Sequence, residues 1–132
     1  MKKIADSGLL IAALDAGDEH HAWARRALEE NLPPWFVCEA VLAEVAASIG
    51  TPIPVLEMLL AGDLEMAFQI EEHAPEVMAL ARKYRDQNMD LADACIVRMS
   101  ELFDATVFTV DKKDFTIYRK HSRQKIPCVF PQ

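Results

Sequence analysis

The chain has 132 residues, of which 52% are hydrophobic and 27% charged, and its formal net charge is −7. This composition is typical of one globular domain and excludes a disordered, collagen-like or disulfide-stapled chain. No apolar run is long enough to cross a bilayer, and the N-terminus lacks the apolar segment of a signal peptide, so we expect a cytoplasmic protein. The three cysteines have no C-x-x-C spacing, which favours reduced thiols over a disulfide framework or a zinc site.

Short runs that predict strands alternate along the chain with segments of helical periodicity. In chain order, the patterns predict a strand at 3–5, an apolar helix directly after Asp6, a helix over 19–30, a strand at 35–38, helices over 39–49 and 53–60, a strand at 64–70, helices over 75–87 and 91–103, and strands at 106–110 and 126–130. Asp18 is the predicted N-cap of the second helix, Gly50 and Gly62 end the next two, and Pro75 is placed in a first turn. The alternation predicts an α/β domain with a mainly parallel sheet.

Several acidic residues lie where solvation alone does not explain them. Asp6 and Asp111 each follow directly on a predicted buried strand, and ligands of open parallel sheets bind beyond the carboxyl ends of the strands. Glu44 lies among small and apolar residues within a predicted helix. Asp90 and Asp93 are three residues apart at the start of an apolar helix, which places them near one face of its first turn. Each acid alone also has a structural interpretation, as a helix cap, a turn residue or a surface residue.

If the acids other than Asp90 converge, their carboxylates repel one another, which raises their pKa values or demands a cation. All-oxygen, carboxylate-rich sites suit hard cations such as Mg²⁺ or Mn²⁺. Such ions activate water and stabilise the negative charge that develops on a phosphate. A convergent acidic cluster therefore favours metal-assisted hydrolysis of a phosphodiester.

The positive charge of the chain is concentrated near its C-terminus. Residues 112–125 hold six Lys or Arg residues against one acid, a local balance of +5 that leaves −12 for the rest of the chain. This segregation favours contact between the basic segment and a polyanion such as RNA, and the alternative is a solvated surface segment. The predicted RNA-contacting residues are Lys112, Lys113, Arg119 and Lys120.

Four segments resemble the motifs of PIN-domain ribonucleases, in the same order along the chain. They are Ile4-Ala5-Asp6-Ser7-Gly8, Cys38-Glu39-Ala40-Val41-Leu42-Ala43-Glu44-Val45, Met89-Asp90-Leu91-Ala92-Asp93-Ala94, and Phe108-Thr109-Val110-Asp111-Lys112-Lys113-Asp114-Phe115 followed by Tyr118-Arg119. Ser7 stands where many members of the family have threonine, a change that keeps the hydroxyl. The resemblance spans about residues 3 to 130, and it implies a PIN-like three-layer α/β/α sandwich over residues 1–132.

The same resemblance implies a Mg²⁺- or Mn²⁺-dependent endoribonuclease. Small members of the family are commonly VapC-type toxins of toxin–antitoxin pairs, usually dimeric and held inactive by an antitoxin, so RNA, an antitoxin and a second copy of the chain are the implied partners. Apolar residues 58–60 are available to either protein partner. By matching position, the implied catalytic and metal-binding residues are Asp6, Glu44, Asp93 and Asp111, and the implied secondary site residues are Asp90, Asp114 and Thr109.

Three other functions are compatible with acids at strand ends. A receiver-like domain usually has an acidic pair after its first strand, but here Asp6 is followed by Ser7. A haloacid-dehalogenase-like enzyme needs a second aspartate two residues after the first, where this chain has Gly8. The third alternative is a catalytically silent PIN-like scaffold that binds RNA or protein. Its usual signature is the loss of core acids, and all of them are present in this sequence.

Overall fold

The computed structural model, which describes residues 2–132, contains a central sheet whose strands are all parallel. The strand order across the sheet is β3-β2-β1-β4-β7. These strands span Lys2–Ala5 (β1), Trp35–Val37 (β2), Leu64–Met66 (β3), Ala105–Phe108 (β4) and Cys128–Val129 (β7). The predicted parallel α/β architecture is therefore confirmed.

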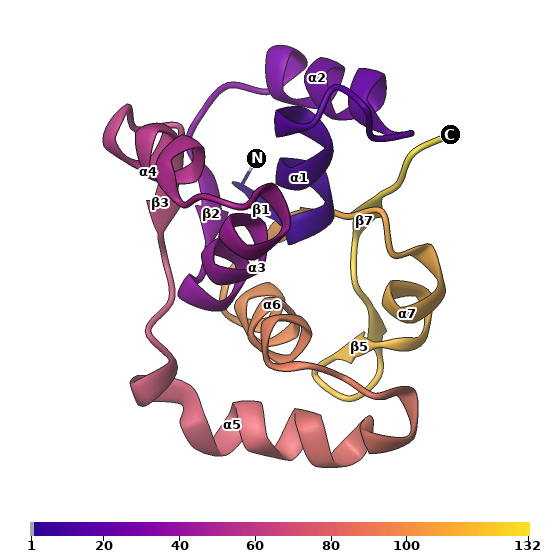
Figure 1. The fold of residues 1–132 in the computed structure, drawn as a ribbon. Helices are drawn as coiled ribbons and strands as arrows, with labels where there is room; N and C mark the ends of the chain where they lie inside the picture. Colours follow the sequence, from indigo (N-terminus) through magenta and orange to yellow (C-terminus); the bar gives the residue numbers. More distant parts are fainter. Residues whose placement is uncertain (1) are drawn as a thin grey trace.

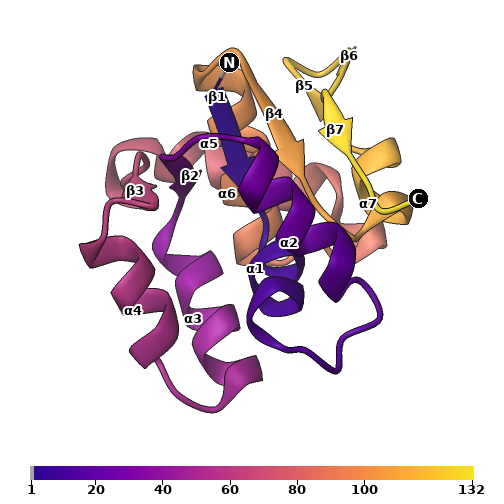
Figure 2. The same ribbon diagram turned by 90° about the horizontal axis from the view of Figure 1, so that it is seen from above.

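Helices cover both faces of the sheet (Figures 1 and 2). They span Ser7–Leu14 (α1), His21–Glu30 (α2), Glu39–Ile49 (α3), Ile53–Leu60 (α4), Ile70–Lys83 (α5), Leu91–Leu102 (α6) and Lys112–Ile117 (α7), with a 3₁₀ turn at Arg85–Gln87 (η1). Helices α1 to α4 lie on one face, α5 and α6 lie on the other, and α7 lies beyond β4 at the β7 edge (Figures 1 and 2). This arrangement is the expected three-layer sandwich.

The middle strand, β1, marks the point at which the chain reverses its direction across the sheet. From β1 the chain proceeds outward through β2 to β3, and it then returns through α5 and α6 to β4 on the other side of β1. β1 and β4 are in register, with Ala5 opposite Phe108, so they end at the same level. In open parallel sheets such a reversal opens a crevice at the carboxyl ends of the two strands.

The core consists of the strands and the helix faces that pack on them. The side chains of Ile4, Val37 and Val107 are fully buried in the sheet. Trp35 packs edge-on against Phe108, with 4.7 Å between the ring centroids. Helix α6 has seven buried residues and contacts both β1 and β4, so it is held rigidly behind the crevice.

Most predicted helices are confirmed, but the structure corrects two of their N-termini. Helix α2 begins at His21, and Asp18 is not its cap: its carboxylate accepts the His20 N–H at 2.8 Å in the preceding turn. Helix α5 begins at Ile70, so Pro75 lies inside the helix rather than in its first turn. Proline leaves the carbonyl four residues earlier without a helical partner, and that residue, Glu71, is exposed to water.

Several strand predictions also need correction. β3 covers only the first residues of the predicted 64–70 strand, because Ile70 already begins α5. β4 ends at Phe108, so Asp111 does not follow directly on a strand but caps a helix, α7, that the sequence patterns did not predict. The basic segment also forms an unpredicted antiparallel hairpin, with strands Arg119–Lys120 (β5) and Gln124–Lys125 (β6). Within residues 2–132, no helix combines the length and apolar character needed to span a membrane.

Candidate active site

An open cleft lies beyond the carboxyl ends of β1 and β4, where the strand order reverses. Its volume is about 630 Å³. It is lined by all six acidic residues that the sequence singles out, and no lysine or arginine of residues 2–132 is among its lining residues. The six acids are Asp6, Glu44, Asp90, Asp93, Asp111 and Asp114. Four separate segments of the chain therefore build one strongly negative site.

Three of these acids are also helix N-caps. The carboxylates of Asp6, Asp90 and Asp111 accept backbone N–H groups in the first turns of α1, α6 and α7, at 2.7, 2.8 and 3.0 Å respectively. A carboxylate in this position satisfies a free amide and interacts favourably with the helix dipole. The structural interpretation as helix caps is thus correct for Asp6 and Asp90, whereas Asp111 caps a helix rather than beginning a turn, and all three helices begin at the same cleft.

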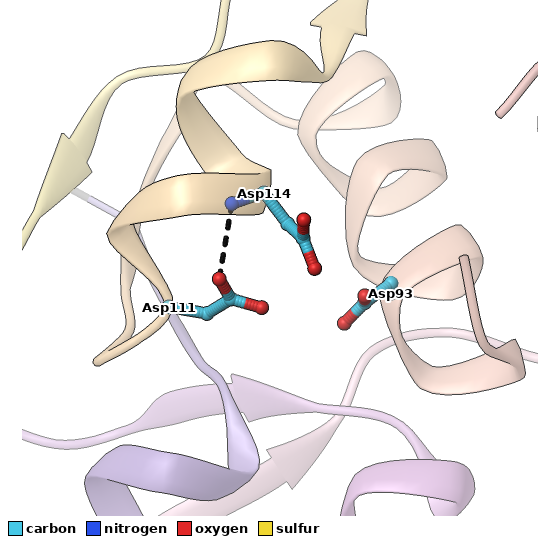
Figure 3. A group of neighbouring side chains, drawn as sticks. All are labelled: Asp93, Asp111 and Asp114. Atoms are coloured by element: carbon cyan, nitrogen blue, oxygen red, sulfur yellow. Dashed lines mark hydrogen bonds between the residues drawn. The ribbon is translucent and has the colours of Figure 1, made fainter. Parts of the chain in front are cut away.

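The tightest group of acids comes from α6 and α7. One carboxylate oxygen from each of Asp93, Asp111 and Asp114 lies within 4.8 Å of the others, and Figure 3 shows the three side chains facing one another. All three are partly exposed, so the cleft leaves them open to solvent. An all-oxygen group of this kind has the donor chemistry that Mg²⁺ or Mn²⁺ requires. Asp114, implied only as a secondary acid, thus lies within the central group.

Asp6 lies deeper than these three and is held by Thr109. The Thr109 hydroxyl donates to Asp6 Oδ2 at 2.6 Å and accepts the Asp111 N–H at 3.0 Å. Thr109 is fully buried, and Asp6 is only 6% exposed. A single hydroxyl therefore fixes the acid at the end of β1 relative to the acid that begins α7.

Glu44 reaches the same cleft from the middle of α3 and is partly buried. Burial raises the pKa of Glu44, the Ser7 hydroxyl lowers it in part, and the negative charge of Asp90 raises it further. Glu44 and Asp6 lie outside the group formed by the α6 and α7 acids. The structure thus brings all of the implied acids to one cleft, but it does not place all of them within a single coordination distance.

The acids of the cleft perturb one another electrostatically. Burial, followed by the charges of Asp90 and Asp6, raises the pKa of Asp93 from 3.8 to about 8. Burial also raises the pKa of Asp6, against the hydrogen bonds from Thr109 and Ser7. The pKa of Asp114 is raised by burial and then by the charge of Asp111. Lys113 opposes these shifts by lowering the pKa of Asp114 in part, and carboxylates with raised pKa values in a cleft are a common feature of functional sites.

The residues predicted to contact RNA fall into two places. Lys112 and Lys113 are exposed on the first turn of α7, beside the acids of the cleft. Lys120 lies in the hairpin, whose tip is fixed because the His121 N–H donates to Glu101 at 2.8 Å, near the end of α6. Glu101 follows Asp93 by eight residues, which is about 12 Å along a helix. The hairpin tip therefore lies well away from the acids.

Arg119 has a structural role that the sequence did not reveal. Its guanidinium donates to the carbonyls of Thr116, Ile117 and Tyr118 at 2.7, 3.2 and 3.0 Å. These carbonyls end α7, and a cation at a helix C-terminus stabilises the helix. Substitution of Arg119 would therefore disturb α7 as well as any contact with RNA.

Tyr118 belongs to the site, although the sequence assigned it no role. Its hydroxyl donates to Asp93 Oδ2 at 2.9 Å, and the side chain is fully buried. Burial, followed by the charge of Asp93, raises the pKa of the Tyr118 phenol well above its usual range, which keeps the proton on the hydroxyl. Its place next to Arg119 at the end of the fourth motif-like segment does not indicate a contact 25 residues back along the chain.

Comparison with known proteins gives two matches. The family model of the PIN domain matches residues 3–120. The chain is also similar to the protein named Ribonuclease VapC26 of Mycobacterium tuberculosis (strain ATCC 25618 / H37Rv), with 28% identity over 123 residues. The aligned region covers 88% of this chain and 91% of that protein. The family-model match includes the four segments that supply the acids of the cleft.

Proposed function

The chain belongs to the PIN-domain family, and we propose that it is a metal-dependent endoribonuclease that hydrolyses RNA phosphodiester bonds as the toxin of a toxin–antitoxin pair. The observation that carries this proposal is the cleft of six acids with no cationic side chain in its lining among the described residues. The match over residues 3–120 supports the accompanying proposal that residues 1–132 form one PIN-like domain. Cellular RNA as the substrate fits the predicted cytoplasmic location.

The donor set of the cleft fits a hard divalent cation. We propose that Asp93, Asp111 and Asp114 hold Mg²⁺ or Mn²⁺, because their oxygens are close together and no lysine or arginine of residues 2–132 lines the cleft with them. Such an ion, when bound, lowers the pKa of a water molecule and stabilises negative charge on the phosphate. Asp6 and Glu44, which are the other two predicted ligands in this cleft, complete the site from β1 and α3.

The remaining chemistry falls to side chains of this chain. Asp6 is held in one orientation by Thr109, so its carboxylate can orient a water molecule in the cleft. Glu44 is partly exposed, and its raised pKa makes its carboxylate a better proton acceptor than an ordinary glutamate. Asp90, the cap of α6, acts through its charge, which raises the pKa values of both Glu44 and Asp93.

The first test is cleavage of RNA by the purified protein, free of any antitoxin, with Mg²⁺ or Mn²⁺ and then with EDTA. We expect cleavage with either ion and none with EDTA, because the acids repel one another until a cation neutralises them. A folded protein that binds RNA but cuts no RNA under any of these conditions would be the catalytically silent scaffold instead.

We further propose that the α7 lysines contact RNA next to the cleft and that the hairpin extends this contact. Changing Lys112 and Lys113 together to glutamine is expected to weaken RNA binding and to lower its salt slope by up to about 0.7 for each lost phosphate contact. The same is expected, to a smaller extent, for Lys120→Gln, which leaves the structural contacts of Arg119 intact.

These effects are measured by titrating labelled RNA at several salt concentrations in EDTA, so that binding is observed without cleavage. Arg25 and Arg26 are exposed on α2 and line no part of the cleft, so their double change to glutamine is the matched control. An unchanged salt slope in the Lys112/Lys113 variant would show that the α7 part of the basic segment is only a solvated surface.

An antitoxin and a second copy of the chain remain the proposed protein partners. Helix α4 offers an apolar surface for either of them, since Ile53, Leu56 and Leu60 are exposed. Of the residues 58–60 singled out in the sequence, Met58 and Leu59 are partly buried against the core, whereas Leu60 is 88% exposed and gives most of the available apolar surface.

A further inference from the structure

Tyr118 occupies the junction between the two helices that supply the clustered acids. Its backbone N–H donates to the carbonyl of Asp114 at 3.0 Å, and its hydroxyl donates to the carboxylate of Asp93 at 2.9 Å. One residue is therefore bonded to two members of the group drawn in Figure 3, one on α7 and one on α6.

The ring of Tyr118 has little freedom to move. It packs edge-on against Tyr84 at 5.0 Å and against Phe115 at 5.2 Å between ring centroids, and it is fully buried. Tyr84 lies at the end of α5 and Phe115 lies on α7, so the ring is held from two sides. A hydroxyl on a ring that is packed in this way is a donor at a fixed position.

The hydroxyl determines how the Asp93 carboxylate is presented. A carboxylate has two oxygens and about four acceptor positions, and the Tyr118 hydroxyl occupies one position on Oδ2. The remaining acceptor positions can be turned toward an ion, since an oxygen of Asp93 lies within 4.8 Å of oxygens of Asp111 and Asp114. Without the hydroxyl, the carboxylate can rotate about its last bond, and the group loses its alignment.

We propose that Tyr118 is a positioning residue for Asp93, holding that carboxylate in the orientation in which it binds the divalent cation together with the acids of α7. This inference rests on the proposed function, since it concerns the same acidic site. It adds a residue outside the acidic set. In metal sites, loss of a group that orients a ligand typically lowers metal affinity or activity about 10- to 100-fold.

The test compares Tyr118→Phe with Tyr84→Phe. Both changes remove one phenol hydroxyl from the same ring cluster, but the Tyr84 hydroxyl accepts the backbone N–H of Arg119 at 2.9 Å instead of donating to an acid of the cleft. Mn²⁺ binding to the metal-free protein is measured by calorimetry without RNA. We expect Tyr118→Phe to raise the Kd for Mn²⁺ at least about tenfold and Tyr84→Phe to change it less than about twofold.

Cleavage assays provide a second readout that packing alone would not change. In Tyr118→Phe, the Mn²⁺ concentration for half-maximal cleavage should rise by the same factor as the Kd, while the KM for RNA at saturating Mn²⁺ stays unchanged. Thermal melts of both variants report any loss of packing. Equal Mn²⁺ affinity in wild type and Tyr118→Phe, or equal loss in both variants, would overturn the inference.

A measurement on the unaltered protein avoids any effect of substitution on folding. The chain has two tyrosines, so selective tyrosine labelling gives two ring signals in NMR spectra. The Tyr84→Phe variant assigns the two signals, because only the Tyr118 signal persists in it. Mg²⁺ should shift the Tyr118 signal of the unaltered protein, and no shift on Mg²⁺ binding would contradict the inference.

The role of Tyr118 and the nuclease function can fail separately. If the protein binds Mn²⁺ and the binding depends on Tyr118, but it cuts no RNA, the proposed nuclease function alone is refuted. If it binds no Mn²⁺, both proposals are refuted.

Discussion

Asp93→Asn is expected to abolish metal-dependent RNA cleavage while it stabilises the metal-free protein. Asp93 belongs to the clustered acids, and loss of a group that only orients a metal ligand already costs up to about 100-fold. Removing Asp93, the proposed ligand itself, should therefore cost more than about 100-fold in kcat/KM. The amide oxygen of asparagine can still accept the Tyr118 hydroxyl, so the contact between α6 and α7 is retained.

The stabilisation follows from the raised pKa of Asp93. Its pKa is about 8 in the folded protein against an ordinary value of 3.8, so the folded state binds the proton more tightly than the unfolded state. The stability from this group is fully present below about pH 4 and is lost as the pH rises through about 8. At pH 8, Asp93→Asn should increase the free energy of unfolding by on the order of 1 kcal/mol, which raises the Tm by a few degrees.

The loss of RNA cleavage and the gain in stability can both be measured on one preparation of the variant. Thermal melts of metal-free wild type in EDTA should show a Tm that falls between pH 5 and pH 8, and Asp93→Asn should reduce this fall. Asp104→Asn is the control, because Asp104 is exposed and lines no part of the cleft. Full cleavage activity in Asp93→Asn would remove this residue from the mechanism. A lower Tm at pH 8 would mean that the carboxylate stabilises the fold.

Gly8→Ala is expected to reduce cleavage strongly because no side chain fits between α1 and the segment that follows β4. A Cβ at Gly8 would lie 2.4 Å from Val110 Cγ2, and valine is stiff at its first torsion. Overpacking of this kind costs about 1–3 kcal/mol, which exceeds the gain of about 0.5–1 kcal/mol from replacing glycine in a helix. The clash moves α1, which follows Asp6, away from the segment that carries Asp111, and a misplacement of about 1 Å can cost about 100-fold in rate.

A second substitution distinguishes displacement of α1 from direct obstruction of the cleft by the new alanine side chain. Val110→Ala removes the methyl groups that the new Cβ would meet, so Gly8→Ala/Val110→Ala should regain most of the activity and stability of Val110→Ala alone. Gly17→Ala is the matched control, since the nearest atom to its Cβ is Asp15 Oδ1 at 3.3 Å, far from the cleft. If the double variant folds normally but stays inactive, the alanine blocks the substrate instead.

Patterns that depend on neighbouring residues were sufficient for much of the fold. The apolar run before Asp6, the buried strand at Trp35–Val37 and the helix that ends at Gly50 were all predicted close to their observed bounds. The errors occur where such patterns are weak or misleading. Pro75 was read as a helix start although the helix begins at Ile70, and the polar segment after Asp111 gave no signal for α7.

The sequence by itself predicted the α/β class from apolar periodicity, which is local and reflects which residues avoid water. Its resemblance to PIN-domain ribonucleases supplied the full set of acids that line the cleft and their order along the chain. Only the tertiary structure decided how these acids group. The Thr109–Asp6 hydrogen bond spans 103 residues of sequence, and it exists because β1 and β4 pair in register. Asp114 lies beside Asp93, and Tyr118 contacts Asp93, because of how α7 is placed relative to α6. No spacing within either segment encodes this geometry.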